Sequence, residues 1–482
     1  MAIHGSMRPV IGMTLVLQLA AACGQLTGTG VKPFQTGSDP DLRDETSRQT
    51  SHESLLRLDD RELPQFADAA TSSDTTAGVA IGNLEELATA IGVSRLRQSG
   101  YRGQGQRIAI LDNGFSGLKN SLDSGRLPPT IVYVPGREGS ASADTAHGTK
   151  LAEVVHAFAP EAEIVLINSN GYSNFIRAID QCLARGVTMV LYAQVWEYGG
   201  NFDGTGFINR EVNRATSAGI LWVNAAGNYG LATWEGQLRA IEQNATGDNP
   251  STNPAADQAL MDGAWEQRYI RFHIPSPSLA KIVLTWDDFR DEKTWRTRED
   301  FDLVIEDASH RPIAASRMIQ DGEDHGLDEK YSAHARELIR AQLPQGTYYA
   351  RVEVKNSATI ARLPKFRFSI DAFGAQVLDA RSVNSIMIPA DNPSVVTVGA
   401  WDTAMSGTGR GQLWMKPDIM APSRLTFADG QSVLGSSSAA AVTAGALAAW
   451  QSRHGRIDHN GFNALRGSDA IANPATRRLF VH

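Results

Sequence analysis

The sequence predicts an α/β protein: a parallel sheet with helices on both faces, interrupted by an antiparallel β-sandwich. The parallel sheet is predicted because short apolar runs alternate with amphipathic segments, and these runs are apolar at almost every position. The sandwich is predicted because, after about position 235, apolar and polar residues alternate within each run. The α/β pattern returns near position 395, so we expect the sandwich to be inserted into the α/β unit.

The α/β elements follow one another in single alternation. Strands are expected over 107–111, 163–167, 187–195, 220–223 and 395–398, and helices over 151–158, 174–184, 208–217 and 437–450. Strands separated by single helices are typical of a parallel sheet. The inserted strands are expected over 282–286, 301–305, 348–354 and 366–370. In the third of these, alternate residues share one face, which is typical of a half-exposed antiparallel strand.

With 482 residues, the chain is long enough for two or three folded units. We divide it into a signal peptide (1–23), a polar leader (24–83), an α/β unit in two pieces (84–240 and 384–482) and the inserted sandwich (241–383). The leader is rich in Ser, Thr, Asp, Gly and Gln and shows no sustained strand pattern, which is typical of a solvated tether.

The N-terminal segment has the order of a secretory signal. Arg8 precedes an apolar stretch, Val10–Ala22, which is too short for a comfortable transmembrane helix and ends in small residues before Cys23. The segment Leu19–Cys23 also resembles a bacterial lipoprotein signal, in which the cysteine is lipidated. Two expectations follow: simple cleavage with release into the periplasm or medium, or membrane attachment through a lipidated Cys23.

Composition excludes some classes of protein. The net charge of −8 and the pI of about 5.8, with no basic stripe, argue against binding to nucleic acid. Hydrophobic residues make up 42% of the chain and charged residues 20%, values typical of folded domains. If Cys23 is lipidated or removed, the remaining Cys182 has no disulfide partner. Cys182 lies in an apolar helical pattern, so we expect a buried side chain rather than a nucleophile.

Two polar residues occupy positions suited to proton transfer. Asp112 closes the first buried strand and precedes the turn signal Asn113-Gly114, so it should lie at the carboxyl end of a parallel strand. His147, within Ala-His-Gly-Thr, begins a helix, and the helix dipole there favours a neutral imidazole that can accept a proton. Taken alone, each residue is as well explained by a capping or structural role.

Two further residues suit nucleophilic attack and anion binding. Ser437 lies in the run Gly-Ser-Ser-Ser-Ala-Ala-Ala, whose small side chains would leave its hydroxyl and backbone N–H uncovered at the start of a buried helix. Asn228 follows a buried strand within Asn-Ala-Ala-Gly-Asn and offers an amide donor. Helix capping and turn formation are the alternative roles of these two residues.

The joint order Asp112, His147, Asn228 and Ser437, each in its own local context, resembles the subtilisin-like serine peptidases. The segments Tyr101–Gly105, Ser394–Gly399 and Lys416–Pro422 add to the resemblance, which covers about 84–235 and 384–482, and a β-sandwich between the Asn and the Ser resembles a bacterial branch of the family. The resemblance implies that Ser437 attacks a peptide carbonyl, His147 is the general base, Asp112 orients it and Asn228 lines the oxyanion hole. It also implies a protein or peptide substrate.

The chain departs from the family pattern at three places. Ser436, Ser438 and Ala441 replace Thr, Met and Pro around the nucleophile, which are sterically mild changes. The segment Tyr192–Trp196 stands where the family usually has Ser-Leu-Gly, a wall of the pocket for the residue before the cleaved bond, so side-chain preference stays open. No inhibitory propeptide is recognisable in the leader.

Other functions were weighed against this one. A pseudo-peptidase that binds partners at the cell surface would account for the altered segment Tyr192–Trp196, although all four site residues are present. An α/β-hydrolase is disfavoured because no Gly-x-Ser-x-Gly elbow occurs, and a zinc enzyme because no His-Glu-x-x-His or paired Cys spacing occurs. We expect no cofactor. The sequence leaves open the oligomeric state and Ca²⁺ binding by the insert, whose candidate carboxylates are Asp287, Asp288, Asp300 and Asp302, and His325 and His334 are interpreted as surface residues.

Overall fold

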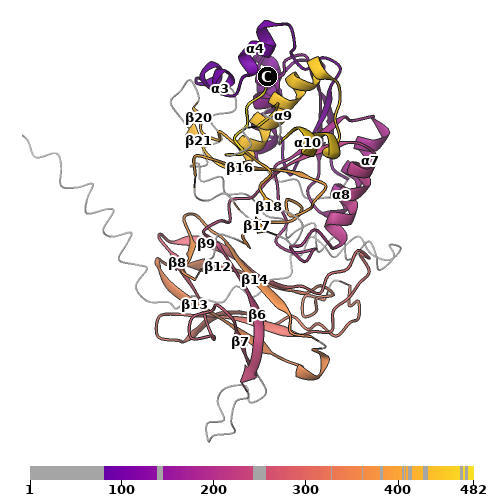
Figure 1. Ribbon diagram of the computed structural model, residues 1–482. Coiled ribbons are helices and arrows are strands. Elements are labelled where there is room, and N and C mark those ends of the chain that lie inside the picture. Colours follow the sequence, from indigo (N-terminus) through magenta and orange to yellow (C-terminus); the bar gives the residue numbers. More distant parts are fainter. Residues whose placement is uncertain are drawn as a thin grey trace, which may run out of the picture.

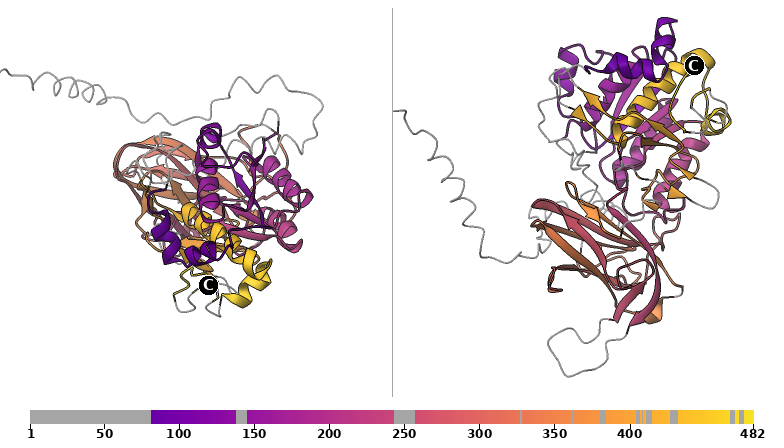
Figure 2. Two further views of the ribbon diagram at one scale, coloured as in Figure 1. Left: turned by 90° about the horizontal axis from the view of Figure 1, so that it is seen from above. Right: turned by 60° about the vertical axis from the view of Figure 1, so that its left-hand side comes forward.

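Two lobes stand one above the other in Figure 1, and the right-hand view of Figure 2 shows the same division. The upper lobe holds the helices and the lower lobe consists of strands. The computed structural model describes residues 81–482, apart from 138–144, 243–256, 327, 361, 380–383, 404–406, 408, 411–414, 427–431, 467–469 and 473–475. The predicted signal peptide, including Cys23, and the predicted leader up to position 80 lie outside the described residues.

The helical lobe is built on a seven-stranded sheet in the order β19-β16-β5-β4-β1-β3-β2. Every pair of neighbouring strands in it is parallel. The strands are β1 (Arg107–Asp112), β2 (Val132–Val134), β3 (Glu163–Asn168), β4 (Met189–Tyr192), β5 (Leu221–Ala225), β16 (Val396–Ala400) and β19 (Ile419–Ala421). The predicted α/β class is thereby confirmed.

Strand β4 is shorter than the sequence predicted. The prediction ran to Val195, but β4 ends at Tyr192. Beyond this point the chain leaves the sheet, and the backbone of Trp196 pairs with that of Ile388, with N···O distances of 2.6 and 3.3 Å. The residues after Tyr192 are largely apolar because they are buried against other parts of the fold. An apolar run indicates burial, and it does not show where the strand ends.

Helices cover both faces of the parallel sheet, and alternate residues of β1 show which ones. Ile108 and Ile110 belong to the core that contains α6 (His147–Phe158) and α9 (Ser436–His454). Ala109 and Leu111 belong to the core that contains α7 (Tyr172–Ala184) and α8 (Phe207–Ser217). The shorter helices are α3 (Leu84–Ala90), α4 (Val93–Gln98), α5 (Leu118–Asp123) and α10 (His459–Leu465).

Helix α9 is buried on every side from Ser436 to Gln451, and its small residues let α6 approach closely. A Cβ placed on Gly445 would lie 2.6 Å from the Cβ of Phe158, closer than two carbons can come. The run of Ala and Gly thus sets the distance between the two helices.

The lower lobe is a ten-stranded antiparallel sheet formed by the segment between β5 and β16. The first part of β6 pairs with β14, and its second part pairs with β7, so one strand serves both halves of the sheet. Its strands are β6 (Thr233–Glu242), β7 (Asp257–Met261), β8 (Ile270–Ile274), β9 (Ser278–Trp286), β10 (Phe301–Glu306), β11 (Pro312–Ser316), β12 (Arg336–Leu343), β13 (Gly346–Val354), β14 (Lys365–Asp371) and β15 (Gln376–Val377). Because β6 begins at Thr233, the insert starts before position 241, the predicted boundary.

Rings from the two halves of this sheet contact one another. The ring centroids of Trp286 and Phe301 lie 5.0 Å apart, and those of Phe301 and Phe366 lie 4.9 Å apart. The same apolar core continues to the face of the parallel sheet covered by α7 and α8, where the rings of Phe207 and Phe289 lie 5.9 Å apart. At this contact the insert therefore packs on the α/β unit through apolar side chains.

One expectation about the insert is wrong. His325 is exposed, as predicted, but His334 is buried, with its ring 5.3 Å from that of Phe207. The sequence around His334 is polar, and the burial comes from contact between the insert and α8, which no local pattern can reveal.

The start and the end of the insert are held together by one buried arginine. Arg367 of β14 forms an ion pair with Glu235 at 2.7 Å and donates a hydrogen bond to the carbonyl oxygen of Ile386. Asn384 also donates to Glu235, at 2.9 Å. Both ends of the insert thus leave the α/β unit side by side.

Candidate active site

The Asp112 carboxylate is fully buried at the end of β1, between β3 and β4. Its Oδ2 lies 2.6 Å from His147 Nδ1. Its Oδ1 accepts hydrogen bonds from the backbone N–H of Gly114 at 3.2 Å and from Gln194 Nε2 at 3.4 Å. A buried carboxylate needs such donors to remain charged, and together they fix its orientation. The short bond to Nδ1 leaves the other ring nitrogen, Nε2, as the site of proton exchange.

His147 is the first residue of α6, and its side chain is 11% exposed. The next residue, Gly148, allows the helix to meet β1. A Cβ at Gly148 would lie 2.4 Å from the ring of Phe115 and 2.7 Å from the Cβ of Asp112. The backbone N–H of Gly148 also donates to the carbonyl oxygen of Gly114 at 3.1 Å. Glycine is therefore required at this position to keep the imidazole next to the carboxylate.

Ser437 lies in the first turn of α9 and is almost fully buried. Its hydroxyl donates a hydrogen bond to the carbonyl oxygen of Ala193 at 3.1 Å. The neighbouring Gln194 contacts the Asp112 carboxylate, so the segment after β4 connects the regions around the serine and the aspartate. The residues that the sequence proposed from three distant segments are thus gathered at the carboxyl edge of the parallel sheet.

Asn228 follows β5 after Gly227, whose φ of +85° makes the tight turn that glycine favours. The Asn228 Oδ1 accepts hydrogen bonds from the backbone N–H of Ser436 at 3.0 Å and from its hydroxyl at 3.1 Å. Because a backbone N–H can only donate, these bonds identify Oδ1 and orient the amide. The buried Nδ2 has no hydrogen-bond partner among the described residues, so the side chain presents a free donor beside the start of α9.

The altered segment Tyr192–Trp196 is held by its own set of polar contacts. Trp196 Nε1 donates to the Tyr192 hydroxyl at 2.9 Å, and Asn224 Nδ2 donates to the carbonyl oxygen of Gln194 at 3.3 Å. Sequence reasoning proposed no role for Gln194. The sequence does contain a signal for such a role: Gln194 is a polar residue in the otherwise apolar run Tyr192–Trp196, and a buried amide needs a hydrogen-bond partner.

Other candidate chemistries find little support. Cys182 is fully buried in α7, and this burial raises the pKa of its thiol far above the usual range, which makes it a poor nucleophile. Within the described part of the chain, no group of three or more His, Cys, Asp or Glu side chains is arranged to hold a metal ion. None of the helices within these residues is long and apolar enough to cross a bilayer.

The acidic residues of the insert are largely engaged with basic ones. Asp287 forms an ion pair with Arg362 at 2.8 Å. Asp302, another of the candidate Ca²⁺ ligands, is buried and contacts Arg317 at 2.6 Å and Lys355 at 2.8 Å. These two carboxylates are therefore neutralised by bases rather than directed toward a common centre.

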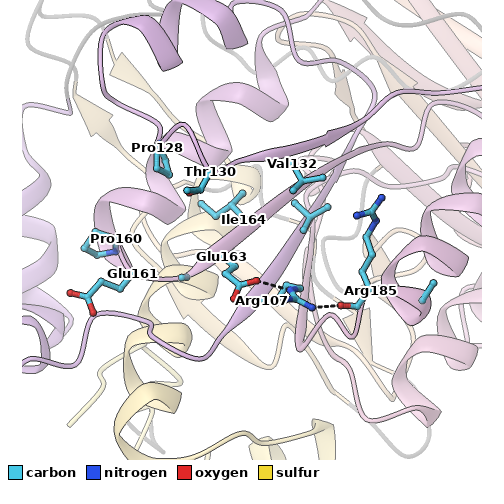
Figure 3. Close-up of a pocket in the computed structure, with 12 residues that line it drawn as sticks. Arg107, Pro128, Thr130, Val132, Pro160, Glu161, Glu163, Ile164 and Arg185 are labelled. Carbon is cyan, nitrogen blue, oxygen red and sulfur yellow. Dashed lines mark hydrogen bonds and ion pairs between the residues drawn. The ribbon is translucent and has the colours of Figure 1, made fainter.

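A separate hollow of about 800 Å³ lies at the amino ends of β1 and β3. Figure 3 shows the residues that line it, among them Arg107, which pairs with Glu163 at 2.7 Å and also bonds the carbonyl oxygen of Arg185. The amino ends of parallel strands lie at the edge opposite their carboxyl ends. None of the proposed site residues lines this hollow.

Comparison with known proteins places the chain beside proteases. No protein-family model matches it. It is 29% identical over 168 residues to alkaline elastase YaB from a Bacillus strain, a match that covers 33% of this chain and 43% of the relative, less than half of that protein's length.

Solved structures give similar results, all at 13% identity. The CspB protease of Clostridium perfringens matches over 82% of this chain and 97% of its own with a TM-score of 0.48, and the nisin leader peptidase NisP of Lactococcus lactis over 82% and 90% with a TM-score of 0.40. A cold-adapted subtilisin-like serine proteinase matches over 79% and 90% with a TM-score of 0.36. These three solved structures are of a protease, a leader peptidase and a serine proteinase.

Proposed function

We propose that the chain is a subtilisin-like serine endopeptidase that cleaves peptide bonds at the carboxyl edge of its parallel sheet. The observation that carries this proposal is the 2.6 Å hydrogen bond between Asp112 and His147, formed at the same edge where Ser437 and Asn228 lie. The match to an alkaline elastase supports the same reaction class. Protein or peptide substrates follow from this class.

In the proposed reaction the Ser437 hydroxyl attacks the carbonyl carbon while His147 Nε2 takes its proton. Asp112 holds the imidazole through Nδ1 and stabilises the positive charge that forms on it. The tetrahedral oxyanion accepts hydrogen bonds from Asn228 Nδ2 and from the Ser437 N–H, at the positive end of the α9 dipole. Collapse expels the amine, which receives the proton from His147, and water then hydrolyses the acyl-enzyme by the same steps in reverse.

The test is active-site labelling with a fluorophosphonate, which bonds only to an activated serine. Mature protein should carry one label, on Ser437, and should hydrolyse a denatured protein substrate. Ser437→Ala should remove both, whereas Ser438→Ala, next to it in α9, should keep the label. A folded mature protein that is neither labelled nor able to cleave any member of a peptide library would contradict the proposal.

We also propose that the chain is exported and anchored through a lipidated Cys23. The basis is the sequence of the N-terminal signal. Mass spectrometry of the mature N-terminus should find a diacylglyceryl cysteine, and Cys23→Ala should release the protein from the membrane fraction. An unmodified N-terminus downstream of position 23 in exported protein would favour simple cleavage instead.

A further inference from the structure

A buried chain of polar contacts joins the insert to the candidate oxyanion hole. The Tyr229 hydroxyl donates a hydrogen bond to Glu197 Oε1 at 2.9 Å. Lys281 Nζ lies 3.0 and 3.2 Å from the two carboxylate oxygens of Glu197. All three side chains are buried, at 5%, 2% and 8% exposed. Tyr229 is the residue after Asn228, and Lys281 belongs to β9 of the insert.

Because Tyr229, Glu197 and Lys281 are buried, removing any one of the three side chains should disturb the other two. An unpaired carboxylate in the interior is costly, so Glu197 keeps its place only while both donors are present. Asp371 is the register partner of Lys281 on β14, but burial and the Glu197 charge raise its pKa to about 7. Lys281 acts electrostatically on Asp371 as well, and it contacts both carboxylate oxygens of Glu197 directly. Burial and Glu197 also raise the pKa of Tyr229, which keeps its hydroxyl protonated as a donor.

Both residues that flank Asn228 are restrained by the fold. The carbonyl oxygen of Gly227 accepts a hydrogen bond from the Gly407 N–H at 2.8 Å, and that of Tyr229 accepts one from the Ala232 N–H at 3.0 Å. The Tyr229 ring packs in a small cluster with Val195, Ala232 and Met387, and its hydroxyl bond to Glu197 adds a side-chain restraint. The Asn228 amide is held at its oxygen by Ser436, while the position of its Cα depends on the flanking residues. A donor aimed at a transition state loses effect when it is displaced by a fraction of an ångström.

We propose that Lys281 of the inserted sheet is a positioning residue for the reaction, acting through Glu197 and Tyr229 to hold Asn228 where its amide can stabilise the oxyanion. This inference rests on the proposed function. It gives the insert a part in catalysis, because a residue from the insert supplies the last contact of the chain. Asn228 itself remains the group that touches the reacting atoms.

The principal experiment is a double-mutant cycle on kcat. Tyr229→Phe removes only the hydroxyl and should lower kcat about three- to tenfold with KM within about twofold, since the lost restraint acts in the transition state. Asn228→Ala should lower kcat about 10²–10³-fold. In the Asn228→Ala background, Tyr229→Phe should have no further effect. A residue with a merely structural role would give the same loss in both backgrounds.

Variants of Lys281 test the contact that the insert makes with Glu197. Lys281→Met should lower kcat as Tyr229→Phe does, and Lys281→Arg should restore most of it. If Lys281→Met fails to fold, Glu197→Gln/Lys281→Met removes both charges and should show the same loss of kcat. Lys355→Met is the matched control. Lys355 also pairs with a buried carboxylate of the insert, Asp302, at 2.8 Å, but this pair is not part of the Tyr229–Glu197–Lys281 series. The kcat of the Lys355→Met variant should equal that of the wild type.

The outcomes separate the two proposals. Unlabelled, inactive wild-type protein would overturn the proposed function and this inference with it. Two results with an active wild type would overturn this inference alone. In the first, Tyr229→Phe and Glu197→Gln/Lys281→Met both keep the full kcat. In the second, these variants lower kcat by the same factor whether position 228 is Asn or Ala.

Discussion

At the residue scale, the two oxygens of the Asp112 carboxylate have different hydrogen-bond partners. One oxygen bonds the imidazole, and the other accepts from the Gly114 N–H and from Gln194. The backbone donor is kept in every substitution of Gly114 other than proline, whereas the 3.4 Å bond from Gln194 is long and therefore weak. Gln194 is therefore a secondary restraint on the carboxylate.

Gln194→Ala should lower kcat less than tenfold, because Gly114 still orients the carboxylate. Asp112→Asn should lower it by about 10⁴-fold, the loss typical of this change in a Ser-His-Asp triad, because the amide favours the wrong imidazole tautomer. Steady-state kinetics on one peptide substrate compares the two. Equal losses would show that Gln194 is as important as the aspartate's charge.

Asp391 carries a different consequence of burial. Its carboxylate is fully buried and accepts hydrogen bonds from the Gly204 N–H at 2.9 Å and from Asn209 Nδ2. Burial nevertheless outweighs these bonds and raises its pKa to about 6. Since the folded state holds this proton more tightly than the unfolded chain, the contribution to stability is full below about pH 4 and is lost as the pH rises to about 6.

Asp391→Asn should remove this dependence. Urea unfolding at pH 4, 5, 6 and 7 should show the variant gaining stability relative to the wild type between pH 4 and 6, with a constant difference above pH 7. Parallel curves for the two proteins over the whole range would mean that Asp391 has an ordinary pKa.

Among the elements, the contact between α6 and β1 leaves no space at Gly148. An alanine in a helix is usually about 1 kcal/mol more favourable than glycine. Here its Cβ would overlap the Phe115 ring and the Asp112 Cβ, so the sign is reversed. Gly148→Ala should destabilise by about 1–3 kcal/mol and should also reduce kcat, because the helix start carries His147.

Thermal unfolding and kinetics together test this prediction. Gly445→Ala is the control, since its Cβ would collide with Phe158 at the far side of α6, away from His147. It should cost comparable stability with a smaller loss of kcat. A Gly148→Ala variant with wild-type stability and rate would show that the helix can shift without disturbing the imidazole.

The sequence was sufficient for the elements that follow local rules. The ends of strand β1 and of helices α6, α7 and α8 lie within four residues of their predicted positions, because periodicity in a buried run reports burial directly. The edge strands β2 and β19 have three residues each, too few to form a pattern. The end of β4 was missed because the residues after it are equally buried without being in the sheet.

At the candidate site, four residues could be proposed from the sequence because each lies at a strand end or helix start that the pattern marks. Glu197, Tyr229 and Lys281 were not found, because their contacts join segments separated by long stretches of chain. No local signal identifies the partner of a buried charge; only the assembled fold does.

For the whole molecule, the shared apolar core has a direct consequence. Phe207 and Tyr198 are buried partly by residues of the insert, including Phe289 and His334. Replacing 236–383 by a short Gly-Ser linker would expose this face, and a contiguous apolar patch of that kind promotes aggregation. The truncated protein should be insoluble or should bind a hydrophobic dye, measured beside the wild type.

A matched control is Leu279→Ser, at a side chain 63% exposed on β9, which should leave solubility and unfolding temperature unchanged. A truncated protein that stays monomeric with native near-ultraviolet circular dichroism would show that the α/β unit is independent of the insert.

The clamp of Arg367 between Glu235 and the Ile386 carbonyl bears on how such a protein can diversify. A segment whose two ends emerge at one point can be extended, shortened or replaced while the strands that carry it keep their places. Descendants of this chain could therefore acquire new recognition modules beside the candidate site, while Asp112 and His147 keep their places.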